Sequence, residues 1–160
     1  MKKNINIEYE YFESSKELND IEKKLFDLAK SSRLKAYAPY SKFLVGCAIL
    51  LENGEIISGN NQENAAYPSG LCAERTAIFY ASSEFPDVKI KKLFVIGASS
   101  ENLQKVVPTP PCGACRQAIM EYESKQKENI EIFFANMQDE VCKINSVSSL
   151  LPFTFDASFL

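Results

Sequence analysis

The 160-residue chain contains no histidine, so any metal site that it builds has to do without an imidazole ligand. It also lacks an excess of positive charge: 18 Lys and Arg stand against 21 Asp and Glu, and the formal charge is −3. Proteins that bind nucleic acid usually carry a basic stripe, so we expect no nucleic-acid partner. No run of apolar residues approaches the length that spans a bilayer, so we expect no membrane association either.

The composition is otherwise that of an ordinary globular chain, with 46% hydrophobic and 24% charged residues. No repeat, low-complexity tract or linker interrupts the sequence, and we expect a single domain over residues 1–160. The first residues lack the apolar run of a secretory signal. Five cysteines, an odd number, indicate thiols or metal ligands rather than disulfides. We therefore expect a cytoplasmic protein.

Hydrophobic periodicity predicts an alternation of strands and helices. Within an N-terminal extension (residues 1–13), residues 4–11 alternate strictly between polar and apolar side chains, which is typical of a half-buried strand. A capping box at Ser14–Glu17, followed by apolar residues at helical spacing, predicts a helix to about residue 35. Asn53-Gly54 suits a tight hairpin turn. Further strands are expected over 43–51, 55–58, 92–97, 130–135 and 140–144, and further helices over about 72–82 and 112–123.

This order of elements predicts an α/β fold of three layers, α/β/α. A mixed five-stranded sheet is expected in the middle layer, with helices on both of its faces. The alternating residues 1–13 are available as one more strand at an edge of that sheet.

The reactive side chains gather in two short runs, Cys72-Ala73-Glu74 and Pro111-Cys112-Gly113-Ala114-Cys115. Cys-x-Glu followed downstream by Pro-Cys-x-x-Cys is the pattern of zinc-dependent deaminases of bases and nucleosides, here in its three-thiolate form. Three protein ligands leave the fourth tetrahedral position open to water, as in catalytic zinc sites. Cys72, Cys112 and Cys115 are therefore the candidate ligands of one zinc ion per chain.

Each run begins at the predicted N-terminus of a helix. Cys112 and Cys115 are three residues apart, so their sulfurs lie on one face of a first helical turn. Free backbone N–H groups and the helix dipole favour thiolates there. Arg75 and Arg116 each adjoin a motif and could donate hydrogen bonds to the sulfurs, which would offset their excess negative charge. We favour Arg75 for this role.

Glu74 is the candidate catalytic residue. It lies two residues beyond Cys72, where a carboxylate can take a proton from water at the metal and deliver it to the substrate. The alternative is an acidic residue that interacts only with the dipole at the start of its helix.

Two other interpretations of the cysteines remain open at this point. One is a redox-active Cys-x-x-Cys pair, which would need neither Cys72 nor Glu74. The other is a closed structural zinc site with Cys47 or Cys142 as the fourth ligand. Both of these cysteines lie in strand-like apolar runs, where a buried free thiol is the simpler interpretation.

Several further runs resemble the cytidine deaminases of the small, homotetrameric type, within the cytidine and deoxycytidylate deaminase superfamily. The resemblance extends from about Ala36 to Phe155. Several independent motifs in the same order make it more specific than Pro-Cys-x-x-Cys alone. The runs that carry it are Ala38-Pro39-Tyr40-Ser41-Lys42-Phe43, Asn61-Gln62-Glu63-Asn64-Ala65-Ala66-Tyr67, Ala73-Glu74-Arg75-Thr76-Ala77, Cys115-Arg116-Gln117 and Leu150-Leu151-Pro152.

The resemblance implies the same three zinc ligands and Glu74 as the proton shuttle. It also implies a homotetramer with its sites at subunit interfaces. For substrate binding it assigns Asn61 and Glu63 to the ribose hydroxyls, Phe43 to the pyrimidine, the backbone around Ala65 to the base edge, and Phe155 to the site of a neighbouring subunit.

The activity implied by the resemblance is the hydrolytic deamination of cytidine or 2′-deoxycytidine to the uridine and ammonia, a reaction of pyrimidine salvage. The nearest alternative is a deaminase of a modified cytosine nucleoside, such as a blasticidin-type enzyme. A polynucleotide cytosine deaminase is disfavoured by the acidic composition. A non-catalytic zinc module is the alternative from another class, although such a module has no use for Glu74.

Overall fold

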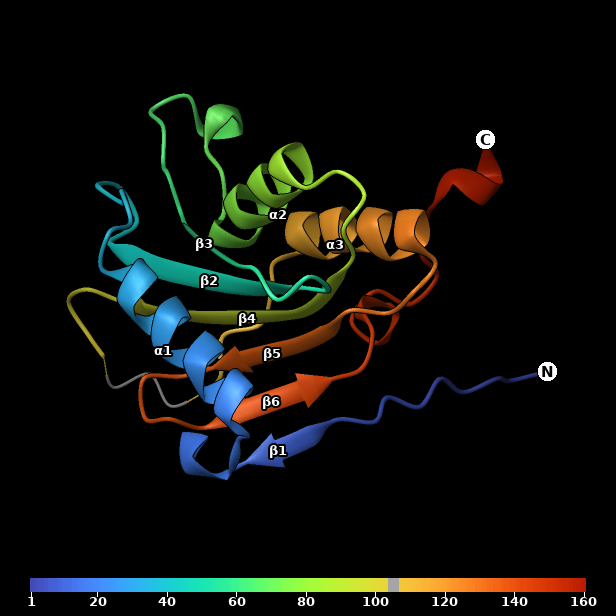
Figure 1. The fold of residues 1–160 in the computed structure, drawn as a ribbon, viewed down its shortest axis with the longest axis horizontal. Helices are drawn as coiled ribbons and strands as arrows, with labels where there is room; N and C mark the ends of the chain where they lie inside the picture. The colour runs from blue at the N-terminus through green and yellow to red at the C-terminus, as the bar shows by residue number, and fades with distance from the viewer. Residues whose placement is uncertain (104–106) are drawn as a thin grey trace.

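A computed structural model of the chain, describing residues 1–103 and 107–160, has one mixed β-sheet with helices on both faces (Figure 1). Across the described residues the sheet has six strands in the order β1-β6-β5-β4-β2-β3, and only β4 and β5 run parallel to each other. The strands are β1 (Glu10–Phe12), β2 (Phe43–Leu51), β3 (Ile56–Asn60), β4 (Ile90–Ser99), β5 (Glu131–Ala135) and β6 (Val141–Ile144). The α-helices are α1 (Asp20–Arg33), α2 (Ala73–Glu84) and α3 (Gly113–Gln126), and short 3₁₀ turns lie at Ser15–Glu17, Tyr67–Ser69, Val147–Ser149 and Ala157–Phe159.

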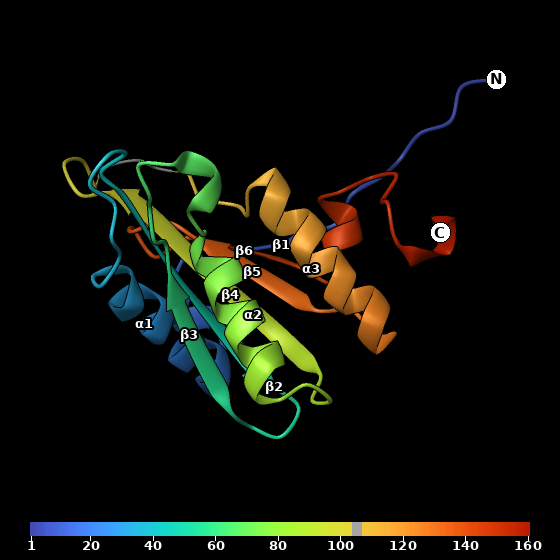
Figure 2. The ribbon, with the colours of Figure 1, turned by 90° about the horizontal axis from the view of Figure 1, so that it is seen from above.

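The helices form two outer layers. Figure 2 shows α1 on one face of the sheet and α2 and α3 on the other. The period-two geometry of a strand accounts for this division, because neighbouring residues point to opposite faces. In β2, Cys47 and Ile49 pack in the core beneath α2 and α3, whereas Ala48 between them packs in the core beneath α1.

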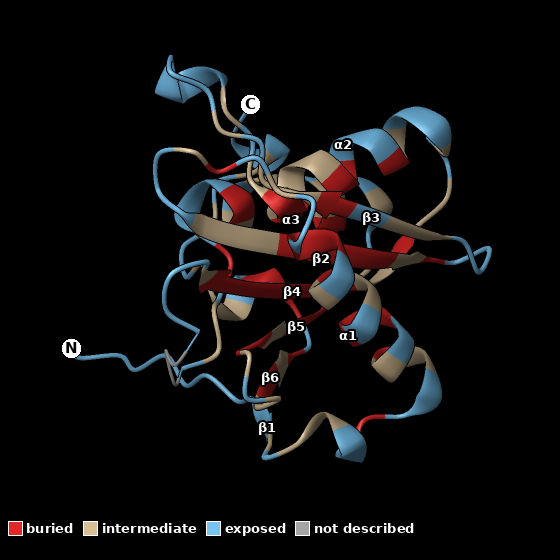
Figure 3. Ribbon diagram, turned by 90° about the vertical axis from the view of Figure 1, so that its left-hand side faces the viewer, coloured by how far each residue is buried: buried red, intermediate tan, exposed pale blue. Residues whose placement is uncertain are grey.

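Strand β4 lies between β5 and β2 and is covered on both faces, as its continuous apolar run predicts (Figure 3). Phe94 anchors the α1 side. Its ring lies edge-on to Phe26 of α1, with centroids 5.6 Å apart, and stacks on Phe133 of β5 at 5.2 Å. The expected three-layer α/β/α arrangement is therefore present.

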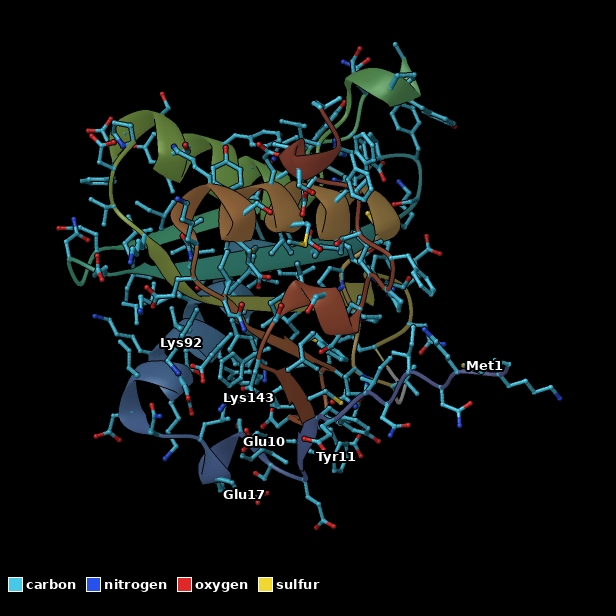
Figure 4. All side chains as sticks on the ribbon, turned by 90° about the vertical axis from the view of Figure 1, so that its right-hand side faces the viewer. Met1, Glu10, Tyr11, Glu17, Lys92 and Lys143 are labelled. Atoms are coloured by element: carbon cyan, nitrogen blue, oxygen red, sulfur yellow. The ribbon has the colours of Figure 1, made fainter. Side chains whose placement is uncertain are left out.

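The sheet has six strands rather than the five expected, because the extra edge strand that the N-terminal extension made available is present as β1. This strand covers only Glu10–Phe12, although residues 4–11 alternate. The reason is the partner: β6 has only four residues, and it pairs with β1 through three of them. Lys143 of β6 forms an ion pair with Glu10 at 3.0 Å, and Figure 4 shows the two side chains beside each other, with Met1 far along the unpaired segment.

The predicted start of the first helix is also wrong. The capping box at Ser14 and Glu17 forms, but it caps the 3₁₀ turn Ser15–Glu17. Helix α1 begins at Asp20 behind a second capping box, in which Asn19 and Glu22 bond each other's backbone N–H groups. Both capping boxes form, so the capping pattern alone does not distinguish the 3₁₀ turn from the start of α1. Leu18, between the two boxes, is buried in the core beneath α1.

The β2–β3 hairpin positions the first turn of α2. Gly54 turns the chain with a φ of 89°, as Asn53-Gly54 predicts. Strand β3 then continues to Asn60, beyond the predicted end at Ser58. Near its end, Gly59 touches α2 so closely that an added Cβ would lie 2.6 Å from the Ala73 carbonyl oxygen and 2.7 Å from the Ala77 nitrogen. Among the described residues, no helix is long and apolar enough to cross a membrane.

We expect Gly59→Ala to lower the free energy of unfolding by about 1–3 kcal/mol, because the new methyl group has to displace the backbone of α2. Urea denaturation measures the change. Gly113→Ala is the matched control, since an added Cβ there meets nothing within 4 Å. Equal stability of the two variants would contradict the close contact between Gly59 of β3 and the backbone of α2.

Candidate metal centre and active site

Three cysteine sulfurs meet where α2 and α3 begin. Cys72 and Cys112 are the residues that precede the first turns of α2 and α3, and Cys115 lies in the first turn of α3. The Cys72 Sγ lies 3.7 Å from the Cys112 Sγ, which lies 3.6 Å from the Cys115 Sγ. All three ligand atoms lie within 4.8 Å of one another. The structure therefore brings together the three cysteines that the two motifs single out.

This spacing fits a zinc ion. Zn–S bonds of about 2.3 Å at tetrahedral angles place two sulfurs roughly 3.8 Å apart, close to the two measured separations. The donor set is also one that zinc prefers, because thiolates are soft ligands. Cys115 is buried, Cys72 is partly exposed and Cys112 is exposed, so the cluster is open on one side.

The thiols do not ionise equally in the free chain. Hydrogen bonding with Cys115, assisted by Arg75, lowers the pKa of Cys72 to about 5 in spite of its burial. The same hydrogen bond, together with burial, raises the pKa of Cys115. One thiolate thus forms readily and a neighbouring one is disfavoured beside it. A divalent cation removes this conflict, because it attracts every sulfur in its thiolate form.

Glu74 lies in the first turn of α2 and is 3% exposed. Burial raises the pKa of its carboxyl to about 7, and the charge of Cys72 adds to the effect. A carboxyl with a pKa near neutrality can both accept and donate a proton. An interaction with the helix dipole alone does not suit a side chain that is buried, hydrogen-bonded with Cys115 and close to the charge of Cys72.

The two arginines that adjoin the motifs have different partners. Arg75 points to the metal ligands: its Nη2 lies 3.7 Å from the Cys72 Sγ, and this hydrogen bond raises the pKa of Arg75. Arg116 donates instead to backbone carbonyls, those of Pro111 and Leu150, each at 2.8 Å. Arg75 is therefore the arginine that contacts a ligand sulfur.

The two remaining cysteines lie outside the cluster. Cys47 is fully buried in the core beneath α2 and α3, and Cys142 is paired with Tyr11 across the β6–β1 ladder. Among the described residues, the one group of three or more potential metal ligands is Cys72, Cys112 and Cys115. A closed site with a fourth thiolate is therefore not present in the described part of the chain.

A cavity of about 310 Å³ opens beside the cluster. Cys72, Glu74 and Cys112 line one part of it, and Phe43 and Val45 from the start of β2 line another. Phe43 is seated against Gly97 of β4, where an added Cβ would lie 2.9 Å from the Phe43 ring. The cavity thus combines an aromatic wall, a buried carboxyl and the open side of the sulfur cluster.

A second cavity, of about 450 Å³, shares Ser41, Asn61 and Cys72 with the first. Glu63 lines it and accepts hydrogen bonds from the Tyr40 backbone N–H at 2.9 Å and from the Ser41 hydroxyl. The bond from Ser41 lowers the pKa of Glu63. The Asn61 side chain is held against the start of β2: its Nδ2 donates to the Phe43 carbonyl at 2.9 Å, and its Oδ1 accepts from the Val45 N–H at 2.8 Å.

Two of the residues predicted to bind substrate do not line these cavities. Ala65 is exposed in the loop before the Tyr67–Ser69 turn and lines neither cavity. Phe155 lies in the C-terminal tail, where it is 57% exposed and stacks on Phe159 with centroids 5.4 Å apart. Within one chain the structure brings Phe43, Asn61 and Glu63 to the cavities beside the cluster, but not these two.

Other lining residues escaped the analysis of the sequence. Thr109 and Pro110 line the cavity at the metal cluster, and the Thr109 hydroxyl donates to the Gly97 carbonyl at 2.9 Å. In the sequence, only their position directly before Pro111-Cys112 indicated that Thr109 and Pro110 could lie near the cluster. Val95 of β4 also lines the cavity. Its period-two position opposite Cys47 places it on the face of α2 and α3, but periodicity alone does not distinguish a cavity wall from the core.

Comparisons with known proteins identify the family of the chain. The profile of the "Cytidine and deoxycytidylate deaminase zinc-binding region" matches residues 19–128. The chain is 40% identical to the cytidine deaminase of Sporosarcina psychrophila over 136 residues, which cover 85% of this chain and 91% of the relative. It is also 40% identical to the cytidine deaminase of Halalkalibacterium halodurans over 129 residues, covering 81% and 89% of the two chains.

Solved structures show the same relationship. The crystal structure of cytidine deaminase from Burkholderia pseudomallei is 38% identical, with a TM-score of 0.71 over 83% of this chain and 98% of that one. The cytidine deaminase from Mycobacterium tuberculosis is 27% identical, with a TM-score of 0.63 over 83% and 95%. The three-thiolate cluster, the buried glutamate beside it and these similarities lead to one conclusion: the chain belongs to the zinc-binding cytidine and deoxycytidylate deaminase family.

Proposed function

We propose that this protein hydrolyses the 4-amino group of cytidine or 2′-deoxycytidine, giving uridine or 2′-deoxyuridine and ammonia. The observation that carries the proposal is the position of Glu74, buried within the wall of a cavity that Cys72 and Cys112 of the three-cysteine cluster also line. The curated relatives named above are cytidine deaminases, which supports this choice of substrate.

Cys72, Cys112 and Cys115 would hold the zinc ion. Bound there, zinc acts as a Lewis acid and makes water a stronger nucleophile at neutral pH. Glu74 takes one proton from the attacking water and gives it to ring nitrogen 3, while the new C–O bond forms at ring carbon 4. Glu74 then carries the second proton to the 4-amino nitrogen, the C–N bond breaks and ammonia leaves. A pKa of about 7 suits a carboxyl that is loaded and unloaded in each cycle.

Arg75 offsets the charge of the ligands. Three thiolates carry one negative charge more than a zinc ion neutralises, and this excess weakens the metal as a Lewis acid. The guanidinium beside the Cys72 sulfur withdraws part of that charge by hydrogen bonding.

Phe43, Asn61 and Glu63 bind the nucleoside. A flat pyrimidine packs on the Phe43 ring in the cavity at the cluster. The ribose extends into the second cavity, where Asn61 and Glu63 suit a neutral sugar with hydroxyl groups better than a phosphate. The backbone around Ala65 reads the base edge once substrate is present.

The assembly proposed is a homotetramer in which Phe155 enters a neighbouring subunit's site. The Phe155 ring is large and exposed, and the C-terminal segment of the chain extends away from the sheet and helices (Figure 1); both observations support this role. Five free thiols, three of them in the cluster, suit a reducing compartment and support a cytoplasmic location.

Purified protein mixed with cytidine is expected to lose the cytosine absorbance and release ammonia, and Glu74→Gln is expected to lower kcat by at least roughly 10²-fold because the proton carrier is gone. The same assay is run with 2′-deoxycytidine and with blasticidin S. Turnover of blasticidin S alone would reject plain nucleosides as substrates. Equal turnover by wild type and Glu74→Gln would reject the role of Glu74.

Elemental analysis of purified variants tests the metal site. We expect about one zinc per chain in the wild type, and loss of zinc in the alanine variants of Cys72, Cys112 and Cys115, because two thiolates hold the ion much more weakly than three. Cys142→Ala is the matched control and keeps its zinc, since Cys142 lies outside the cluster. Zinc that depends on Cys142 would instead indicate a closed structural site.

Phe155→Ala is expected to lower kcat/KM for cytidine roughly tenfold, through loss of one aromatic contact in a neighbour's site. Co-expression of Phe155→Ala with Glu74→Gln then separates a contribution in trans from one in cis. If the aromatic is donated across subunits, mixed assemblies contain sites with an intact Glu74 and a donated Phe155, and activity rises above that of either variant. An active monomer in gel filtration would rule out the donation.

A further inference from the structure

The side chain of Arg33 is buried at the end of α1 and takes no part in the proposed chemistry. It is 3% exposed, and it forms no ion pair with any described residue. Burial lowers its pKa. A buried charge without a counter-charge is costly and persists only where other groups compensate it. The groups that compensate the charge of Arg33 therefore indicate the role of its side chain.

Three backbone carbonyls compensate it. Nε donates to Leu44 of β2 at 3.1 Å, and Nη2 donates to Ala98 and Ser99 of β4 at 2.9 and 3.3 Å. Leu44 and Ala98 are paired across the β2–β4 ladder. The guanidinium thus links the first residues of β2 to the last residues of β4.

The helix reaches this position because Gly46 lets it approach. An added Cβ at Gly46 would lie 2.0 Å from the Ala29 carbonyl oxygen and 2.5 Å from the Arg33 nitrogen. The last turn of α1 therefore rests directly on β2, two residues beyond Leu44. From there the Arg33 side chain extends to the end of the sheet that borders the nucleoside cavities.

The segment that Arg33 holds carries the aromatic wall of the site. Phe43 and Val45 line the cavity at the cluster, on either side of Leu44 in the sequence. Asn61 bonds the backbone of both, and the Ser41 hydroxyl accepts from the Phe43 N–H at 3.0 Å. Before them, Lys42 has a φ of 56°, and its carbonyl accepts from the Ser100 N–H at 2.7 Å. Side chains from several elements thus fix the backbone between Ser41 and Val45.

We propose that Arg33 is a positioning residue for substrate binding: its guanidinium, anchored in α1, fixes the start of β2 so that the Phe43 ring stands where the pyrimidine packs. It acts through Leu44 and the β2 backbone and touches no substrate. The inference deepens the proposed function and rests on it for the identity of the ligand. The metal cluster and Glu74 lie on α2 and α3, so we expect the chemical step to be independent of Arg33.

The test compares Arg33→Lys with the wild type. Lysine keeps the charge but not the planar fork of donors that reaches two strands. We expect KM for cytidine to rise about tenfold, the equivalent of one lost hydrogen bond to a charged group, with kcat within about twofold and zinc content unchanged. In a Phe43→Ala background the same substitution is expected to leave KM unchanged, because the two residues act through one contact.

Lys30→Ala is the matched control, because Lys30 lies one turn earlier in α1 and pairs with Asp139 at 2.9 Å away from the cavities. We expect it to leave KM unchanged whatever it does to stability. A merely structural role for Arg33 would lower the unfolding midpoint of Arg33→Lys without moving KM, or would lower kcat and zinc content together. Either result, or additive effects of Arg33→Lys and Phe43→Ala on KM, would overturn the proposal.

Hydrogen–deuterium exchange gives a readout that needs no substrate. In Arg33→Lys we expect faster exchange over residues 41–46 and unchanged exchange over α2 and α3. Unchanged exchange over residues 41–46 would reject the proposal that Arg33 fixes the start of β2, even if the enzyme deaminates cytidine. A wild type that is inert toward cytidine would reject the proposed function, while the exchange experiment would still decide the role of Arg33.

Discussion

The approach of two helix N-termini to each other is the constraint on which the site depends. Cys72 precedes α2 and Cys112 precedes α3, and their sulfurs lie 3.7 Å apart only because both helices rest on the same face of the sheet. Gly59 contributes directly, since it lets the first turn of α2 press against β3. A shift of either helix by the width of a methyl group would separate the sulfurs by more than one ion can bridge.

The approach of the two helix N-termini brings negatively charged groups together, and positively charged groups nearby offset that charge. Three cysteine sulfurs lie within 4.8 Å of one another, and Cys115 among them is buried, as is the Glu74 carboxyl nearby. The positive ends of two helices, the Arg75 guanidinium and a divalent cation supply the opposite charge. In the free chain the conflict shows in the pKa values: that of Cys72 falls, while those of Cys115 and Glu74 rise. Metal binding and ionisation of the cluster are therefore one coupled event.

The structure divides its work between two kinds of element. The three cysteines and Glu74 stand at the starts of two helices, with Cys72 and Cys112 directly before the first turns and Glu74 and Cys115 within them, and the rigid helix backbone fixes their mutual distances. The proposed nucleoside contacts stand on the start of β2 and in the loop after β3, where side-chain hydrogen bonds replace the missing ladder. Asn61 bonds the backbone of β2 before Gly46, where β3 no longer pairs with it, and Glu63 accepts from the backbone N–H groups of Tyr40 and Ser41. The same residues thus shape the cavities and hold the loops that carry them.

Local sequence patterns were enough to predict the cysteine cluster and the bounds of β2. Cys112 and Cys115 are three residues apart at the start of a helix and so share a face, and the Cys-x-Glu motif added Cys72, so the cluster of three cysteines could be predicted before any fold was known. Strand β2 matched its predicted bounds, Phe43–Leu51, because both its faces are buried and its turn is marked by Asn53-Gly54.

Long-range partners decided the rest. The alternation of residues 4–11 is as regular as that of a strand, yet only Glu10–Phe12 form one, because the neighbouring β6 is short. Two capping boxes obeyed the same local rule, and α1 begins at the second of them. That Arg33 would donate to the carbonyls of Leu44 and Ala98 follows from no pattern in the sequence. Periodicity predicts the face of a helix or strand on which a side chain lies. Which distant residues contact that side chain is decided only by the tertiary structure.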